Sequence, residues 1–214
     1  MTARPIADVP LPQWWDPLAV RAASVDARDI TRFLPPDGRG TSSAVLILLG
    51  EDVEGPDVLV MQRADTLRHH AGQVSFPGGV AEPHDADPAA TALRETEEEV
   101  GLNPDSATVV TTLPELWIPI TGYRVTPVLA WWHAPHPVSA LDPGEVAAVS
   151  RLPVRDLADP VNRLRVRHPS GYIGPAFRLD GLLIWGFTAG VVATMLRLGG
   201  WERPWDRERV LEVS

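Results

Sequence analysis

The sequence contains no cysteine, no apolar run long enough to cross a membrane, and an excess of acidic side chains. Without cysteine, neither disulfide bonds nor thiolate metal sites can form, which fits a reducing compartment, so we expect a cytoplasmic protein. The net charge of −9 argues against nucleic acid as a partner, because nucleic-acid binding needs a basic surface that neutralises phosphates. A phosphorylated small molecule is still allowed, since metal ions and a few arginines can supply positive charge.

Membrane association is also not expected. The uncharged stretch from Gly181 to Leu196 has 16 residues, whereas a spanning helix needs about 20 apolar residues. We interpret this stretch as a buried strand followed by a buried helix. The first thirty residues have no basic start followed by an apolar run, so no signal peptide is expected.

The 214 residues are enough for one domain with additions at both ends. The 22 prolines and 17 glycines indicate many turns. We expect a proline-rich N-terminal extension over residues 1–40 that packs on the domain, the domain itself over residues 41–198, and a polar C-terminal tail over residues 199–214.

The pattern of apolar residues predicts an α+β fold. We expect a short helix at 26–33, a Pro-Pro-Asp-Gly turn at 35–38, and a last helix at 188–198. Two runs rich in branched apolar residues, 42–49 and 57–62, form a hairpin-like pair of strands. Further strands are predicted at 108–116, 123–132, 146–152, 164–167 and 177–185. Because strands and helices do not alternate regularly, we expect a mixed sheet sandwiched between helices.

The segment from Gly72 to Leu102 is the most informative part of the chain. It contains a Phe-Pro-Gly-Gly turn and ends with an acidic helix that reads Arg-Glu-Thr-Glu-Glu-Glu-Val-Gly-Leu from Arg94. Asp87 and Pro88 are suited to the start of this helix, and Gly101 to its end. An apolar stripe at helical spacing predicts that one face packs on the sheet.

Three glutamates of this helix, Glu95, Glu98 and Glu99, are three or four residues apart and therefore project from the same side. Such a cluster repels itself unless a cation binds between the carboxylates, and Mg²⁺ or Mn²⁺ prefers oxygen ligands. The alternative is a solvated acidic surface, which is the usual reason for acidic runs on helices.

Arg94 to Leu102, together with Gly78 and Gly79, resembles the signature of the Nudix hydrolase family, and Thr96 is the departure within that run. The resemblance implies a Nudix-type α/β/α sandwich and a homologous set of site residues. It implies metal ligation by Glu95, Glu98 and Glu99. It implies catalytic roles for a second set: Arg94, Glu95, Glu98 and Glu145.

In this family the arginine orients a neighbouring glutamate, and the carbonyl group of Gly79 is a further candidate ligand. Glu145 is a candidate general base or extra ligand, and its alternative is an exposed turn residue. The family pattern also has a glutamate eight residues before the arginine, where this chain has Ala86. The loop is one residue longer than usual, so a role for the adjacent Asp85 is left open.

The implied chemistry is metal-assisted hydrolysis of a nucleoside diphosphate linked to another group. Metal ions would neutralise the bridging phosphates and lower the pKa of a bound water. That water attacks one phosphorus atom in line with the leaving oxygen, and a carboxylate takes its proton. A non-catalytic ligand sensor on the same fold is the alternative, and the presence of all three glutamates argues against it.

The segment before the glycine turn resembles the additional motif of the coenzyme A pyrophosphatase subgroup. Arg63, Arg68, Gly72 and the Phe-Pro-Gly-Gly turn keep its spacing, with departures at 60, 61 and 64. The resemblance implies that coenzyme A or a derivative is split into 3′,5′-ADP and 4′-phosphopantetheine. We expect substrate binding by Arg63, Arg68, Gly78 and Gly79, because guanidinium groups match phosphate geometry.

Several alternatives stay open at this point. The alternative substrates are ADP-ribose, a dinucleotide or a damaged nucleotide. The alternative for Arg68 and the neighbouring histidines is that they form a solvated loop without contact to the substrate. Trp117 and Tyr123 either line a ligand slot or pack in the sheet. The Trp131–Trp132 pair belongs either to the core or to an interface, and because related enzymes are often dimers, a homodimer is possible.

Overall fold

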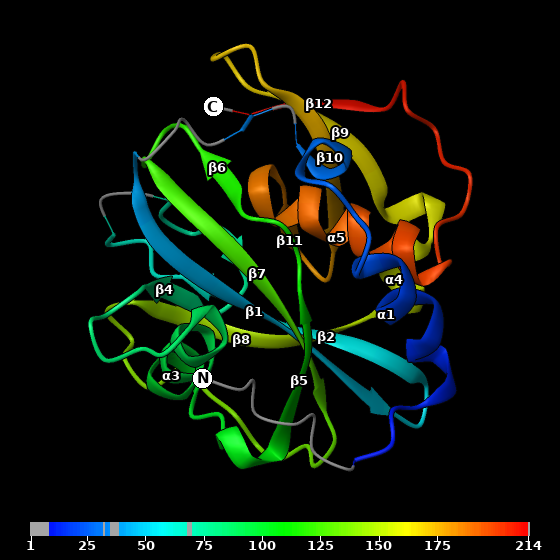
Figure 1. The fold of residues 1–214 in the computed structure, drawn as a ribbon. Helices are drawn as coiled ribbons and strands as arrows, with labels where there is room; N and C mark the ends of the chain where they lie inside the picture. The colour runs from blue at the N-terminus through cyan, green and yellow to red at the C-terminus, as the bar shows by residue number, and fades with distance from the viewer. Residues whose placement is uncertain (1–8, 32, 35–38, 68–69, 214) are drawn as a thin grey trace.

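The computed structural model of the chain describes residues 9–31, 33–34, 39–67 and 70–213 (Figure 1). Within these residues two sheets are present. The eight strands of the larger sheet are β1 Thr41–Asp52, β2 Gly55–Arg63, β3 Val74–Ser75, β4 Gly78–Val80, β5 Ala107–Thr112, β6 Leu116–Ile118, β7 Tyr123–Trp132 and β8 Val146–Pro153. The four strands of the smaller sheet are β9 Arg163–Arg167, β10 Ile173–Leu179, β11 Leu182–Ile184 and β12 Val210–Glu212.

The larger sheet is mixed, as expected. Strand β1 lies at its centre, parallel to β7 and antiparallel to β2 and β4. The buried run from Leu46 to Leu49 explains this position, since a strand covered on both faces is apolar at consecutive residues. Strand β8 pairs with β2, and β5 and β6 pair with β7.

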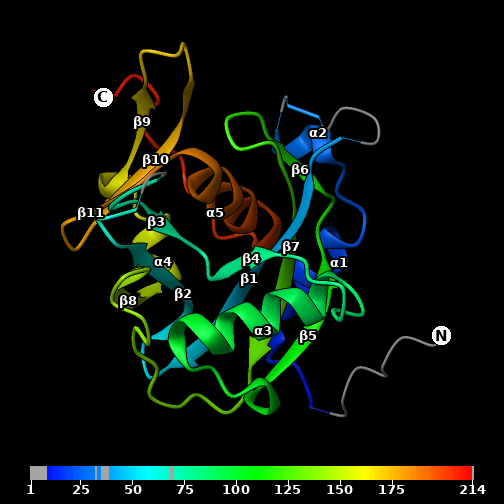
Figure 2. The same ribbon diagram turned by 90° about the vertical axis from the view of Figure 1, so that its left-hand side faces the viewer.

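Helix α3, Pro88–Val100, covers one face of the larger sheet and lies across β1 and β4 (Figure 2). Its limits follow the predicted signals. The carboxylate of Asp87 accepts the backbone N–H of Ala90 at 2.9 Å, and Gly101 ends the helix in the left-handed conformation. Ala92 and Val100 pack on Leu46 and Leu48 in a continuous apolar cluster.

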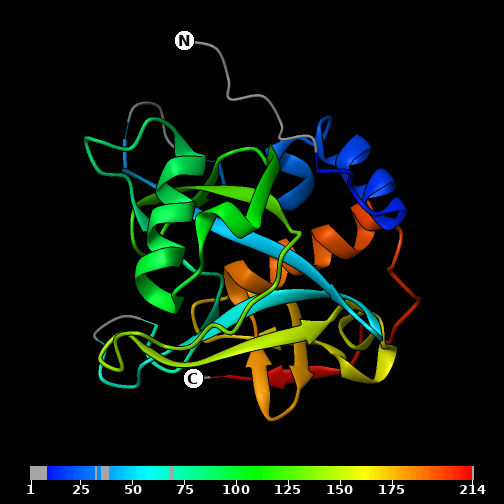
Figure 3. The same cartoon turned by 90° about the horizontal axis from the view of Figure 1, so that it is seen from below.

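The opposite face carries helix α5, Gly186–Gly199, and helix α1, Asp16–Ala22. Their buried side chains share one core with residues of both sheets, including Ile47 of β1 and Phe177 of β10. Figure 3 shows α1 beside the C-terminal end of α5, where the Arg21 guanidinium donates to the carbonyl of Leu198 at 2.9 Å. The expected sandwich is therefore confirmed, and a second sheet that the sequence analysis did not predict adds to it.

The remaining helical segments are short. They are η1 Gln13–Trp15, α2 Ala27–Ile30, η2 Pro104–Ser106, α4 Val154–Ala158 and η3 Pro160–Asn162. Helix α2 is shorter than the predicted 26–33, and it is closed by a capping box in which Asp26 and Asp29 each accept a backbone N–H of the other. The turn expected at 35–38 lies outside the described residues.

Two predicted strands are each divided in the structure. The strand expected at 108–116 is β5 and β6, separated by a segment containing Pro114, which has no N–H for a ladder. The strand expected at 177–185 is a hairpin of β10 and β11, turned by Asp180 and Gly181 with φ of 52° and 79°. Both predictions were wrong in this respect.

The chain ends contribute to the core. Trp14 packs against Trp131 at 5.5 Å and against Trp201 at 5.9 Å between ring centroids, so N- and C-terminal segments meet there. Trp131 and Trp132 are both buried, which assigns this pair to the core. The segment expected as a tail contains β12, which pairs with β9.

The carboxylate of Glu202 also anchors this C-terminal segment by accepting from the buried guanidinium of Arg163 at 3.0 Å. In the described part of the chain, no helix is both long enough and apolar enough to traverse a bilayer.

Candidate active site

The two glycines of strand β4 allow the chain to pass very close to its neighbours. A Cβ atom on Gly78 would lie 2.3 Å from the carbonyl oxygen of Ala44 on β1, and one on Gly79 would lie 2.4 Å from the carboxylate carbon of Glu95. The contact at Gly78 is with backbone atoms, so a side chain there would not fit. At Gly79 the neighbour is the carboxylate of Glu95, which would have to move for a side chain to fit, so the predicted turn and helix residues do meet.

Glu99 is the most buried of the three predicted metal ligands, with 8% of its surface exposed. Its carboxylate accepts the backbone N–H of Gly78 at 2.9 Å. Burial raises the pKa of Glu99 to about 7, and the negative charges of Glu95 and Glu145 act in the same direction. The positive charge of Arg63 acts against this shift, so these four ionisable side chains are electrostatic neighbours.

Arg94 connects the acidic helix to the loop before it. Its guanidinium contacts the carboxylates of Glu95 and Glu98, each at 3.0 Å, and donates to the carbonyl of Val80 at 3.1 Å. Partial burial raises the pKa of Glu95, and the contact with Arg94 opposes that rise. The arginine thus contacts two glutamates, whereas the resemblance implied that it orients one.

Asp85, whose role could not be assigned from the sequence, binds the same guanidinium of Arg94 from the loop before the helix. Its two carboxylate oxygens accept from Nε and Nη2 of Arg94 at 3.1 and 3.0 Å, a bidentate arrangement. The hydroxyl group of Thr91 and the backbone N–H of Glu82 donate to the same carboxylate. These hydrogen bonds, with Arg94 first, hold the pKa of Asp85 well below its usual range.

Two further site residues were predicted outside helix α3, Arg63 before it in the sequence and Glu145 after it, and both lie near Glu99 of that helix. Arg63 is the last residue of β2, and its Nε atom is buried without a hydrogen-bond partner among the described residues. Glu145 is exposed in the loop before β8, and its carbonyl group accepts the backbone N–H of Ala64. This bond ties the Glu145 loop to the residue that follows Arg63. Arg68 lies outside the described residues.

The arrangement suits a divalent cation by the chemistry of its donors, which are carboxylate oxygens. As the side chains stand, no three acidic or histidine side chains among the described residues converge on one point. The side chain of Glu98 is 60% exposed, so it has room to change rotamer.

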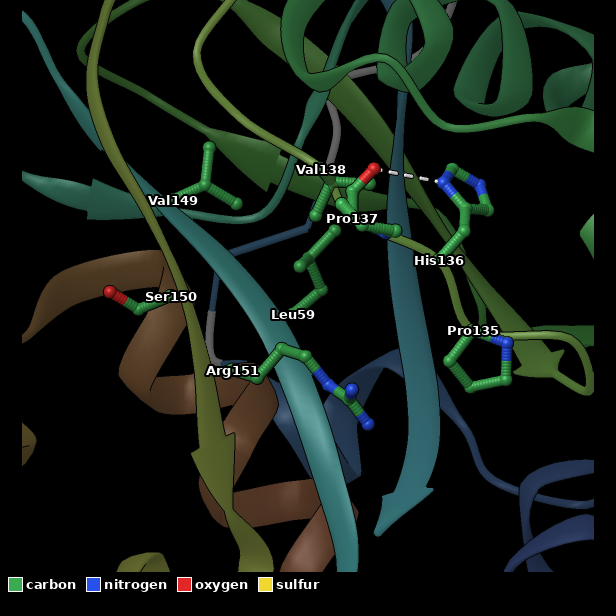
Figure 4. Close-up of a pocket in the computed structure, with 8 residues that line it drawn as sticks. All are labelled: Leu59, Pro135, His136, Pro137, Val138, Val149, Ser150 and Arg151. Atoms are coloured by element: carbon green, nitrogen blue, oxygen red, sulfur yellow. Dashed lines mark hydrogen bonds between the residues drawn. The ribbon is translucent and has the colours of Figure 1, made fainter.

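A separate pocket of about 440 Å³ lies between β2, β8 and the loop before residue 139 (Figure 4). It contains none of the predicted site residues. Its polar groups are already bonded: the Arg151 guanidinium donates to Asp57 at 2.9 Å, and both ring nitrogens of His136 contact backbone groups. The candidate site is therefore the Glu95–Glu99 region and not this pocket.

Trp117 and Tyr123, the candidates for a ligand slot, lie on the paired strands β6 and β7. The ring of Trp117 leaves no room for a side chain at residue 40, where a Cβ atom would lie 2.5 Å from it. Trp117 therefore packs against the start of β1, and Tyr123 is 38% exposed.

Comparison with known proteins agrees with the signature. The model of the NUDIX domain matches residues 39–173. The chain is 38% identical over 157 residues to an uncharacterized Nudix hydrolase, NudL, of Cronobacter sakazakii, covering 70% of this chain and 78% of the relative. NudL of Escherichia coli K12 is 38% identical over 152 residues, covering 67% and 76%.

Solved structures support the fold. The Nudix hydrolase RenU from M. smegmatis superposes with a TM-score of 0.54 at 20% identity, covering 80% of this chain and 100% of that one. A NUDIX hydrolase from Nitrosomonas europaea superposes with a TM-score of 0.51 at 11% identity, covering 83% and 82%. Nudix hydrolases generally use divalent metal ions and act on small nucleotide substrates. The chain belongs to the Nudix family and is a pyrophosphohydrolase of that family.

Proposed function

We propose that this protein hydrolyses the diphosphate bond of coenzyme A or its derivatives, giving 3′,5′-ADP and 4′-phosphopantetheine, and that residues 41–198 carry this activity. The observation that carries the proposal is the neighbourhood of Arg63 and Glu99. The arginine comes from the coenzyme A-type motif at the end of β2, and its charge acts on the most buried glutamate of the acidic helix. This neighbourhood supports a phosphate-binding role for Arg63 beside a metal-binding role for Glu99.

Glu95, Glu98 and Glu99 are proposed to hold Mg²⁺ or Mn²⁺. Glu99 supports this assignment, because a carboxylate with its pKa raised by burial is costly to ionise unless a cation compensates its charge. A bound divalent ion supplies charge neutralisation at the diphosphate and a water of lowered pKa. The backbone of Gly78 and Gly79 lies against the carboxylates of Glu99 and Glu95, so these glycines are proposed to take part in substrate binding beside the metal ligands.

Other side chains are proposed to orient the metal ligands, accept the proton and bind the substrate. Arg94 fixes the orientation of Glu95 and Glu98 through its two 3.0 Å contacts. Glu145, exposed and near Glu99, is proposed as the general base that takes the proton of the attacking water. Arg63 and Arg68 are proposed to bind the phosphate groups of coenzyme A, the 3′-phosphate in particular, since guanidinium groups bind phosphate bidentately.

A substrate panel with product identification tests the proposal. Purified protein is incubated with Mg²⁺ or Mn²⁺ and coenzyme A, 3′-dephospho-coenzyme A, acetyl-coenzyme A, coenzyme A disulfide, ADP-ribose and diadenosine tetraphosphate. We expect the highest kcat/KM for a coenzyme A form, with 3′,5′-ADP as one product. A preference for ADP-ribose or a dinucleotide, or equal rates with and without the 3′-phosphate, contradicts the substrate assignment. Ligand binding without turnover of any compound contradicts the enzymatic proposal.

A further inference from the structure

Asp85 is next to a position at which this chain differs from the family pattern. Where the pattern has a glutamate eight residues before the arginine, the chain has Ala86, whose side chain cannot accept a hydrogen bond. Asp85 is one residue further from Arg94 and is one methylene shorter than glutamate. The loop nevertheless brings its carboxylate onto the Arg94 guanidinium with two hydrogen bonds of 3.1 and 3.0 Å.

The carboxylate of Asp85 is held in place by the loop and by the helix together. The backbone N–H of Glu82 donates to it at 2.9 Å from the loop, and the hydroxyl group of Thr91 donates at 3.0 Å from the first turn of α3. Only 5% of the Asp85 side chain is exposed. A buried carboxylate with this number of fixed donors has one available position, and it fixes the guanidinium plane of Arg94.

Arg94 also contacts the two glutamates. Nη2, which donates to Asp85, contacts Glu95 as well, and Nη1 contacts Glu98, which is otherwise exposed to solvent. Without Asp85, the guanidinium loses the acceptor that aligns its Nε edge, so its contacts with Glu95 and Glu98 are no longer fixed in direction. The two carboxylates would then lose the orientation that Arg94 gives them.

We propose that Asp85 is a positioning residue that replaces the missing glutamate of the family pattern and holds Glu95 and Glu98 ready for metal through Arg94. The proposal rests on the proposed function only in taking these glutamates as the metal ligands. Groups that orient metal ligands commonly change metal affinity or activity by about 10- to 100-fold when they are removed.

The test compares Asp85→Asn and Asp85→Ala with Asp87→Ala. Asp87 caps the same helix but contacts only backbone N–H of Ala90, so its loss weakens the start of α3 without touching Arg94. Mn²⁺ affinity is measured by titration calorimetry without substrate, and kcat and KM are measured with coenzyme A as a function of Mg²⁺ concentration. Unfolding temperatures show that each variant is folded.

Both Asp85 variants are expected to bind Mn²⁺ at least about tenfold more weakly than the wild type. They should need correspondingly more Mg²⁺ for half-maximal activity, while KM for the substrate at saturating Mg²⁺ changes less than twofold. Asp87→Ala should lower the unfolding temperature and leave Mn²⁺ affinity unchanged. If the Asp87 variant loses Mn²⁺ affinity equally, the role of Asp85 is structural and the proposal is wrong.

Unchanged Mn²⁺ affinity in both Asp85 variants would also overturn the proposal. The calorimetric readout separates this outcome from an error in the substrate. A wild-type protein that binds Mn²⁺ but leaves coenzyme A intact would refute the proposed substrate, while the comparison of Mn²⁺ affinities would still decide the role of Asp85.

Discussion

Replacement of Glu99 by glutamine should make the metal-free protein more stable at neutral and alkaline pH while it abolishes catalysis. Glutamine keeps the size of the side chain and an oxygen that accepts the N–H of Gly78. It removes the negative charge that burial makes costly. The substitution therefore separates the two consequences of a buried carboxylate, which are lower stability without metal and binding of a cation.

The magnitude follows from the pKa of Glu99, which burial raises from 4.5 to about 7. The folded protein then holds a proton that the unfolded chain releases, so the contribution of this group to stability is complete below pH 4.5 and is lost as the pH rises through 7. A difference of about 2.5 pKa units corresponds to roughly 3 kcal/mol at pH 8. For a chain of this length that amounts to an unfolding temperature higher by roughly 6–12 °C in the variant.

The assay is thermal unfolding in EDTA at pH 5 and pH 8, with kcat measured separately in Mg²⁺. Glu97→Gln is the matched control, because Glu97 is on the same helix but exposed. We expect Glu99→Gln to be more stable than the wild type at pH 8 and about equal to it at pH 5, whereas the control should differ from it at neither pH. Removal of this preorganised charge should lower kcat by at least about 100-fold.

The metal dependence provides the complementary result. Addition of Mg²⁺ should stabilise the wild type and have a smaller effect on Glu99→Gln, since binding to the native state alone raises stability. Equal stability of the variant and the wild type at pH 8 in EDTA would refute the reasoning, because it would mean that Glu99 carries no desolvated charge.

Three other substitutions test separate parts of the account. Glu98→Gln should lower kcat by about 100-fold with an unchanged unfolding temperature, because this side chain is 60% exposed; retained kcat would remove its assigned role. Arg63→Ala should raise KM for coenzyme A about tenfold or more, whereas the exposed Arg178→Ala should not; an unchanged KM would show that Arg63 does not bind substrate. Glu202→Ala leaves the guanidinium of Arg163, 2% exposed, without its carboxylate, so the unfolding temperature should fall while KM stays constant; unchanged stability would contradict the anchoring role of this pair.

The parts of the fold that the sequence predicted well are those with local signals. Strand β7 has the predicted limits because Gly122 precedes a run rich in branched and aromatic residues, and α3 begins after Asp87 and ends at Gly101 because caps act within one turn. The Asp-Gly pair at 180–181 was an equally local signal for a hairpin turn, and reading a single strand across it was an error.

Other features depend on contacts between distant segments and could not be predicted from spacing. Strand β12 has three residues and forms only because β9 offers it a partner. Trp131 packs against Trp14, and Trp14 packs in turn against Trp201, so this contact joins segments from opposite ends of the chain. In the site, helical spacing puts Glu95, Glu98 and Glu99 on one helix, but the bond between Asp85 and Arg94 requires the path of the intervening loop, which cannot be read from spacing.

The central claim is that the acidic side chains of α3 hold a divalent cation. Anomalous diffraction from crystals grown with Mn²⁺ and coenzyme A tests it most directly. The account predicts a manganese peak coordinated by carboxylate oxygens of Glu95, Glu98 and Glu99, with the diphosphate bound to the same ion. A fully occupied manganese peak elsewhere, with these three carboxylates still bonded to Arg94 and Gly78, would contradict it.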